Sequence, residues 1–270
     1  MSGPARTVYV SNGRGGTVTP IDTATNTPGE PIEVGVRPRA IVITPDGTTA
    51  YVVNQSRPQP PPWHSQEAEK RGLPQPSPDP RGTVTPIDTA TNTPGAPIEV
   101  GMRPRAIVIT PDSRTAYVVN QSRPQPPPWH NYEAEKRGLP QPAPDPRGTV
   151  TPVDTATNTP GEPIDEGDEP FAIAVTPDGK TVYVANTWEN TGRPASAPCT
   201  VTPIATATDT PGAPIEVGRG PWAFAITPDG QTAYVANRDS GTVTPIRIAK
   251  GTASAPIPAG THPYAIAITP

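Results

Sequence analysis

The chain has 270 residues, a net charge of −4 and a pI of about 5.4. This charge excludes the basic surface by which proteins bind nucleic acid, and no apolar run approaches the roughly 20 residues of a membrane span. The single Cys199 excludes an internal disulfide. We therefore expect no nucleic-acid partner and no insertion into a membrane.

A sequence motif repeats along the chain, and it indicates an ordered fold where the composition alone would not. The 44 Pro and 24 Gly alone would suggest a low-complexity polymer. One copy of the motif reads Tyr-Val-Val-Asn at residues 51–54, and continues at residues 82–88, 97–101 and 106–112. A repeat of this size predicts a solenoid, a propeller or an array.

In chain order, the first strands are expected at residues 7–12, from the Gly-Thr-Val-Thr-Pro motif at residue 16 onward, and at residues 31–34. Residues 40–44 alternate small and branched apolar side chains, which is typical of a strand. Pro45-Asp46-Gly47 then predicts a hairpin turn, because Pro presets φ and Gly tolerates a positive φ. A further strand follows at residues 49–54.

The aspartates shared by the copies are expected to be structural. Those of the Thr-Pro-Ile-Asp motif precede turn residues and are predicted to form Asx turns: Asp22, Asp88 and Asp154. Those of the Pro-Asp-Gly motif belong to hairpin turns: Asp46, Asp112, Asp178 and Asp229. No chemistry is assigned to either set.

The two ends of the chain hold parts of one repeat. The chain opens on the second strand of a unit and closes on a lone first strand at residues 265–269. In a propeller such an offset seals the ring and leaves no open sheet edge. We therefore predict an all-β fold, a five-bladed β-propeller of four-stranded antiparallel blades. It forms a single domain over residues 1–270, closed by pairing residues 264–269 with residues 7–34.

The repeat resembles the YVTN β-propeller repeats of surface-layer and related bacterial and archaeal proteins. The matching motifs are Tyr-Val-x-Asn, Gly-Thr-Val-Thr-Pro-Ile-Asp-Thr-Ala-Thr-Asn-Thr, Pro-Ile-x-Val-Gly and Ala-Ile-x-Ile-Thr-Pro-Asp-Gly. The resemblance covers nearly the whole chain apart from three loops. It implies a propeller, although members of that family usually carry more blades, and they are often exported.

Function is expected where the copies differ, and the largest differences are three loops. Residues 57–81 and 123–147 are nearly identical Pro-rich insertions, each predicted to hold one short helix, and residues 187–199 form a shorter loop that also contains Pro. All three are predicted to rise over one face of the propeller as a hood with one open side.

The copies also differ in the short segment that leads into each innermost strand. The residue after its Pro is predicted to lie at the channel mouth, where Arg binds a carboxylate or phosphate and aromatic rings bind a flat body. The candidate ligand-binding residues are Arg37, Arg39, Arg103, Arg105, Phe171, Trp222, Tyr264, Trp63 and Trp129. The alternative is that these side chains plug a narrow channel and stack on one another.

All three histidines are predicted to lie on this same face. With nearby glutamates they could form a divalent metal site or an acid–base pair. The candidate catalytic residues are His262, Tyr264, His64, His130 and Glu169, and the candidate metal ligands are His64, His130 and His262. No HExxH motif supports a metal, so structural histidines are favoured and no cofactor is predicted.

Three hypotheses of function follow, in order of preference. The first is a propeller that binds a small anionic or aromatic molecule or a peptide at its channel mouth. The second is a protein-interaction scaffold that uses the Pro- and Trp-rich insertions. The third is a lyase or hydrolase with a His, Arg and Tyr site, with or without a metal. We expect a monomer, in the cytoplasm because no signal sequence precedes the first strand, with an exported mature form left open.

Overall fold

The computed structural model describes residues 6–55, 81–121, 148–167, 169–187 and 199–269. The helix predicted in each insertion, at residues 57–81 and 123–147, lies outside these ranges, as does most of the loop at 187–199. The chain divides into two compact units, residues 1–104 and 105–270, and each is described by itself. In the described part, no helix is long and apolar enough to cross a membrane.

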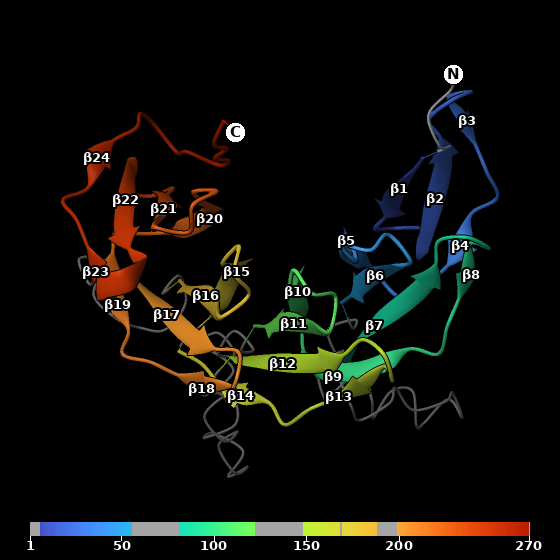
Figure 1. Ribbon diagram of the computed structural model, residues 1–270. Coiled ribbons are helices and arrows are strands. Elements are labelled where there is room, and N and C mark those ends of the chain that lie inside the picture. Colours follow the sequence, from blue (N-terminus) through green and yellow to red (C-terminus); the bar gives the residue numbers. More distant parts are fainter. Residues whose placement is uncertain (1–5, 56–80, 122–147, 168, 188–198, 270) are drawn as a thin grey trace, which may run out of the picture. The chain divides into compact units, whose positions relative to one another are not determined.

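The unit of residues 1–104 contains two antiparallel sheets (Figure 1). The first has the order β1-β2-β3, with β4 also paired to β2: β1 (Thr7–Asn12), β2 (Thr17–Asp22), β3 (Thr27–Pro28) and β4 (Ile32–Glu33). The second has the order β5-β6-β7-β8, with β9 paired to β7: β5 (Pro38–Ile43), β6 (Thr49–Asn54), β7 (Arg81–Asp88), β8 (Thr93–Pro94) and β9 (Ile98–Met102).

The unit of residues 105–270 repeats the second arrangement three times. Its first sheet contains β10 (Pro104–Ile109), β11 (Thr115–Asn120), β12 (Thr149–Asp154), β13 (Thr159–Pro160) and β14 (Ile164–Asp165). Its second contains β15 (Pro170–Val175), β16 (Thr181–Asn186), β17 (Cys199–Ala205), β18 (Thr210–Pro211) and β19 (Ile215–Val217). Its third contains β20 (Pro221–Ile226), β21 (Thr232–Asn237), β22 (Thr242–Arg247), β23 (Thr252–Ala253) and β24 (Ile257–Pro258).

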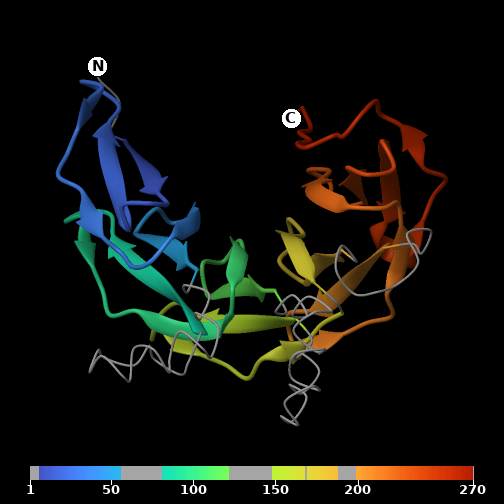
Figure 2. The same ribbon diagram turned by 180° about the vertical axis from the view of Figure 1, so that it is seen from behind.

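Each sheet is made of strands that are consecutive in the chain, and the colours along the chain follow this order from sheet to sheet (Figures 1 and 2). The described residues include no α-helix and only one short 3₁₀-helix, at Ile248–Lys250. The predicted all-β fold of short antiparallel strands is therefore confirmed. The count of five blades for the whole propeller stays a prediction.

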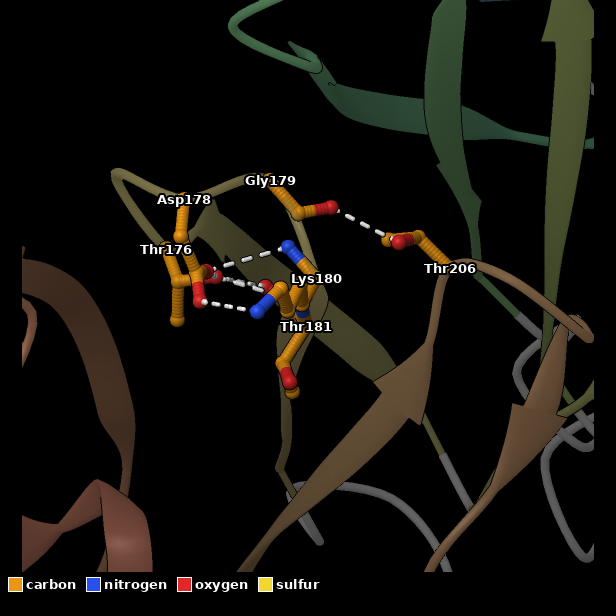
Figure 3. A network of polar contacts seen from close by, with 6 residues as sticks. All are labelled: Thr176, Asp178, Gly179, Lys180, Thr181 and Thr206. Carbon is orange, nitrogen blue, oxygen red and sulfur yellow. Dashed lines mark hydrogen bonds and ion pairs between the residues drawn. The ribbon is translucent and has the colours of Figure 1, made fainter.

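The hairpin turns form as predicted, because an aspartate closes each of them (Figure 3). The Thr176 hydroxyl and the Lys180 amide both donate to Asp178 Oδ1, at 2.6 and 3.1 Å. The Thr206 hydroxyl, in the turn directly after β17, donates to the Gly179 carbonyl at 2.7 Å. The same hydrogen bonds hold the pKa of the Asp178 carboxyl below its usual value. The turn aspartates are thus structural, as expected from the sequence.

Sheets pack face to face on small apolar side chains. In the first unit, Val18 and Val34 of one sheet pack with Val52 and Ile87 of the next. In the second unit, one buried cluster contains Val119 and Val184 from successive sheets. A tyrosine hydroxyl ties neighbouring sheets together: Tyr117 donates to Asp209 Oδ1 at 2.7 Å. Burial and this carboxylate together raise the pKa of Tyr117.

The segment predicted to close the ring is not a strand among the described residues. Residues 264–269 form no strand, and the first sheet ends at β1, whose Val8 and Val10 are 48% and 42% exposed. The apolar alternation at residues 265–269 gives them strand character, but a strand forms only where a partner edge accepts its hydrogen bonds. The predicted partner, residues 7–34, belongs to the other unit, so the closing pair itself stays a prediction.

A backbone prediction follows from the one hairpin turn that lacks glycine. Ser113 has φ +63°, where Gly47 and Gly230 occupy the equivalent positions with φ +76° and +68°. A left-handed conformation costs a residue with a Cβ about 1 kcal/mol. Ser113→Gly should therefore raise the free energy of unfolding by about that amount, measured by chemical denaturation.

The reverse change provides the control. A Cβ added at Gly47 meets nothing within 4 Å, so Gly47→Ser tests the backbone alone and should cost a similar free energy. A Ser113→Gly protein no more stable than the wild type would contradict the assigned strain.

Candidate functional site

The connections that lead into the innermost strands share an unusual backbone. The residue before each Pro has a positive φ, between 50° and 64°: Arg37, Arg103, Glu169, Gly220 and His262. Only one of the five is glycine, although this region strains residues with a Cβ. Strained backbone of this kind is concentrated at binding and catalytic sites.

A hydrogen bond fixes three of these connections against the strand beside them. The carbonyl of the left-handed residue accepts the N–H of the residue that follows the Tyr-Val-x-Asn strand. This bond joins Arg37 to Gln55 at 3.2 Å, Glu169 to Thr187 at 3.0 Å and Gly220 to Arg238 at 2.8 Å. The residue after Asn is thereby brought next to the start of an innermost strand.

The residue after each Pro lies in a β-bulge. The register shifts between Pro170 and Ala172 and between Pro221 and Ala223, so that Phe171 and Trp222 are the extra residues. Arg39 is the extra residue in the first unit. A bulge redirects a side chain that would otherwise follow the alternation of the strand. The same β-bulge therefore occurs in three copies of the repeat, and the bulged residue is different in each.

In the unit of residues 105–270 these side chains gather into an aromatic–arginine cluster: Arg105, Phe171, Trp222, Arg238 and Tyr264. The Phe171 and Trp222 ring centroids are 4.1 Å apart, and those of Trp222 and Tyr264 are 5.3 Å apart with the rings edge to face. The Arg105 guanidinium carbon lies 3.4 Å from the Phe171 centroid. Arg238 lies 5.2 Å from both the Trp222 and Tyr264 centroids.

The cluster runs from the interior to the surface. Phe171 is 8% exposed, whereas Tyr264 is 54% exposed. The Arg105 guanidinium lies over the Phe171 ring in a cation–π contact. The Arg238 guanidinium donates to Asp239 Oδ1 at 2.8 Å, which offsets its charge. The cluster therefore combines three aromatic rings with the guanidinium group of Arg105, while the charge of Arg238 is offset by Asp239.

The structure brings together four of the predicted ligand-binding residues: Arg105, Phe171, Trp222 and Tyr264. The other three described candidates belong to residues 1–104, where Arg39 Nε donates to Gln55 Oε1 at 3.2 Å, Arg37 is exposed and Arg103 is half-buried. Trp63, Trp129, His64 and His130 lie outside the described residues.

The remaining candidates have no metal site among the described residues. His262 is exposed, and Glu169 is 8% exposed with its carbonyl bonded to Thr187. Within the described ranges, no three His, Cys, Asp or Glu side chains are placed to hold a metal ion together.

Sequence reasoning missed Arg238. Arg238 follows the Asn of Tyr-Val-x-Asn, and its N–H donates to the Gly220 carbonyl of the neighbouring connection. The comparable Gln55 contacts Arg39 in the same way. Side chains at this one position, compared across the copies, would have indicated it.

Sequence reasoning also missed Glu166. Glu166 is 4% exposed and stands where other copies have the buried valines Val34 and Val217, 4% and 7% exposed. Both carboxylate oxygens are buried without a hydrogen-bond partner. Burial raises the pKa of Glu166 to about 7, a shift that Thr202, Asn186 and the Gly167 N–H reduce only in part. The signal was an acid at a position, directly after β14, that is a buried valine in other copies.

Two open pockets of about 380 and 330 Å³ lie between successive hairpin turns. Asp112 and Asp178 line the first, and Asp178 and Asp229 line the second. These carboxylates already accept hydrogen bonds from their own turns. The pockets therefore add no candidate chemistry.

A family model described as "Lactonase, 7-bladed beta-propeller" matches residues 83–255, more than half of the chain. None of the curated proteins compared with the chain matches it. The match supports the predicted propeller, whereas the narrower resemblance to YVTN surface-layer repeats stays a prediction.

Solved structures support the same fold at low sequence identity. A functionally unknown protein from Desulfotomaculum acetoxidans gives a TM-score of 0.65 at 17% identity, over 96% of this chain and 68% of that one. Kuenenia stuttgartiensis hydrazine synthase gives 0.54 at 20% identity, over 95% and 84%. The dihydro-heme d1 dehydrogenase NirN, solved in complex with DHE, gives 0.61 at 16% identity. There the match covers 96% of this chain but less than half, 45%, of NirN.

The buried acid predicts how stability depends on pH. The folded protein should hold a proton on Glu166 up to about pH 7, whereas the unfolded chain loses it near 4.5. Between these values the folded state binds more protons. Stability contributed by the neutral acid is therefore full below pH 4.5 and is lost as pH rises to about 7, by about 1 kcal/mol per pH unit.

Glu166→Gln should remove this slope while preserving the shape of the side chain. The measurement is chemical denaturation from pH 4.5 to 8.5 in choline chloride, whose cation is too large to enter a buried site. Glu99→Gln, at an exposed acid, is the control and should keep the wild-type slope. Parallel curves for the wild type and Glu166→Gln would contradict the shifted pKa.

Proposed function

Because the chain belongs to the lactonase family of seven-bladed β-propellers, we propose that its aromatic–arginine cluster binds a small molecule with a carboxylate beside a flat or apolar body. One observation carries this proposal: the Arg105 guanidinium carbon lies 3.4 Å from the Phe171 ring centroid and 5.6 Å from that of Trp222, whose tilted ring is 4.1 Å from Phe171.

The stack combines the two kinds of contact that such a ligand needs. A guanidinium that lies on a ring is held in one orientation, and its planar N–H groups suit the two oxygens of a carboxylate. The half-exposed Tyr264 and the partly exposed Trp222 extend an aromatic surface from the buried Phe171 outward. A flat body could lie against these rings while its carboxylate meets Arg105.

A purely structural stack is the alternative, and it makes a different prediction. If the side chains only plug the fold, replacing Arg105 changes stability and no ligand changes it further. If they bind a carboxylate, a ligand stabilises the wild type through Arg105. The two alternatives are distinguished by whether a ligand raises the stability of the wild type but not of the Arg105 variant. The effect of the mutation without a ligand does not distinguish them.

The family description favours hydrolysis of a cyclic ester as a second candidate function. Opening a lactone ring with water gives a hydroxy acid, and its new carboxylate is the group that Arg105 would recognise. His262, two residues before Tyr264, is exposed and is the candidate proton acceptor. Titration of the released acid with a panel of γ- and δ-lactones tests this. Activity lost in His262→Ala but kept in His262→Gln would count against acid–base catalysis.

The interaction-scaffold hypothesis rests on the Pro- and Trp-rich insertions at residues 57–81 and 123–147, which lie outside the described residues. It stays a proposal from the sequence. Deletion of one insertion, followed by a test of partner capture by the folded protein, addresses it.

Ligand binding is tested with aromatic acids and their uncharged amides. We expect indole-3-acetate and benzoate to raise the Tm of the wild type, and the matched amides to have little effect. Arg105→Ala should weaken binding of the acids by about tenfold or more, the usual loss for a hydrogen-bonded charge. Isothermal titration gives the affinities.

Arg247→Ala is the matched control, since it removes the same charge at an exposed strand end of the same unit. It should leave affinity unchanged. Equal Tm shifts for acids and amides, or equal weakening by both arginine variants, would overturn the proposed carboxylate contact.

A further inference from the structure

One repeat departs from the others in its interior, at a place that neither the fold nor the proposed ligand site accounts for. The N–H of Glu166 donates to the Gly148 carbonyl at 2.9 Å, as the N–H of Val34 donates to Gly16 at 3.0 Å. These equal bonds show that the two residues occupy the same place in the repeat. A carboxylate has replaced a buried valine there without changing the backbone.

The surroundings of this carboxylate are polar but offer too few donors. The Asn186 amide and the Thr202 hydroxyl face the carboxyl group. Asn186 is fully buried, and its Nδ2 donates to Thr202 Oγ1 at 3.0 Å. Asn186 Oδ1 and both oxygens of Glu166 are buried without a hydrogen-bond partner. This repeat therefore buries three acceptor oxygens that have no hydrogen-bond partner among the described residues.

Comparison with the other repeats shows that the buried Asn–Thr pair is shared and that the carboxylate is not. The equivalent Asn54, Asn120 and Asn237 also bond a threonine through Nδ2 and also leave Oδ1 without a partner. Only the repeat with Glu166 adds a negative charge to this arrangement. An unpaired buried charge is costly, so the charge calls for a counterion or a proton.

We propose that Glu166, Asn186 and Thr202 form a buried site for a monovalent alkali cation, sodium or potassium. Hard cations take carboxylate, amide and hydroxyl oxygens as ligands. A single carboxylate balances a single positive charge, whereas a divalent ion would leave an excess charge in the interior. A cation also satisfies several acceptors at once, while one proton supplies one donor.

The site lies beside a connection that the ligand site uses. Thr187, next to Asn186, donates its N–H and hydroxyl to the Glu169 carbonyl at 3.0 and 3.2 Å. Phe171 follows two residues later. An ion held by Asn186 would therefore stabilise the backbone that directs Phe171. The cation site does not depend on the proposed ligand, and its test needs none.

The first experiment compares salts at constant chloride and ionic strength. At pH 8.5, 300 mM sodium or potassium chloride should raise the Tm of the wild type by roughly 2–4 °C over choline chloride, as expected when the salt exceeds Kd several-fold. Glu166→Gln and Glu166→Val should abolish this difference. Glu166→Val restores the residue of the other repeats, so we expect it to fold.

A matched pair of variants tests the amide ligand. Asn186→Ser and Asn237→Ser remove the same side chain from equivalent places, with and without the neighbouring carboxylate. Both lose hydrogen bonds, but only Asn186→Ser should reduce the difference in Tm between sodium and choline. The broadening of the ²³Na signal by wild-type protein, and its loss in Glu166→Val, gives a second measurement that does not depend on stability.

Several results would overturn the site. Equal Tm values in sodium, potassium and choline would leave the proton as the only partner of Glu166. A difference between salts that persists in Glu166→Val would place the ion elsewhere. A Tm rise with 2 mM calcium or magnesium but not with monovalent salts, lost in Glu166→Val, would overturn the assigned ion class.

Discussion

The start of each innermost strand depends on one local constraint, a left-handed residue followed by Pro and then by a bulged residue. The carbonyl of the left-handed residue is bonded to the next strand, and the bulge turns the following side chain out of the regular alternation. Regular strands alone would direct Phe171 and Trp222 to the faces of their own sheets. The constraint instead brings them within 4.1 Å of each other.

This constraint explains how a repetitive chain can carry an individual site. Strands, turns and core positions are nearly the same in every copy, because within each unit successive sheets pack through the same small side chains. The bulged residue contributes little to that packing and can vary. Arg105, Phe171 and Trp222 occupy one position of the repeat with three kinds of side chain, and the fold is the same around each.

The strands and turns could be predicted from the sequence because their signals are local. The Pro-Asp-Gly turn and the Tyr-Val-x-Asn strand each carry their own hydrogen bonds. The grouping of Phe171 and Trp222 could be predicted as well, since both follow the same Pro. Arg238 was missed, because the sequence shows its variable position after the Asn of Tyr-Val-x-Asn but not the bond to Gly220 that places it beside the connection. Residues 264–269 have the pattern of a strand, but a pattern does not supply a partner edge.

The hairpin turns also bear on how the chain ages chemically. Asp-Gly sequences lose their normal backbone when the glycine nitrogen attacks the aspartate carboxyl group and closes a succinimide. At residues 178 and 179 both reactants are occupied: the Gly179 N–H donates to the Thr176 carbonyl at 2.8 Å, and hydrogen bonds keep Asp178 ionised, the less reactive form. Gly47 and Gly230 are held in the same way. The turns that shape the repeat thus also protect its most labile peptide bonds while the chain stays folded.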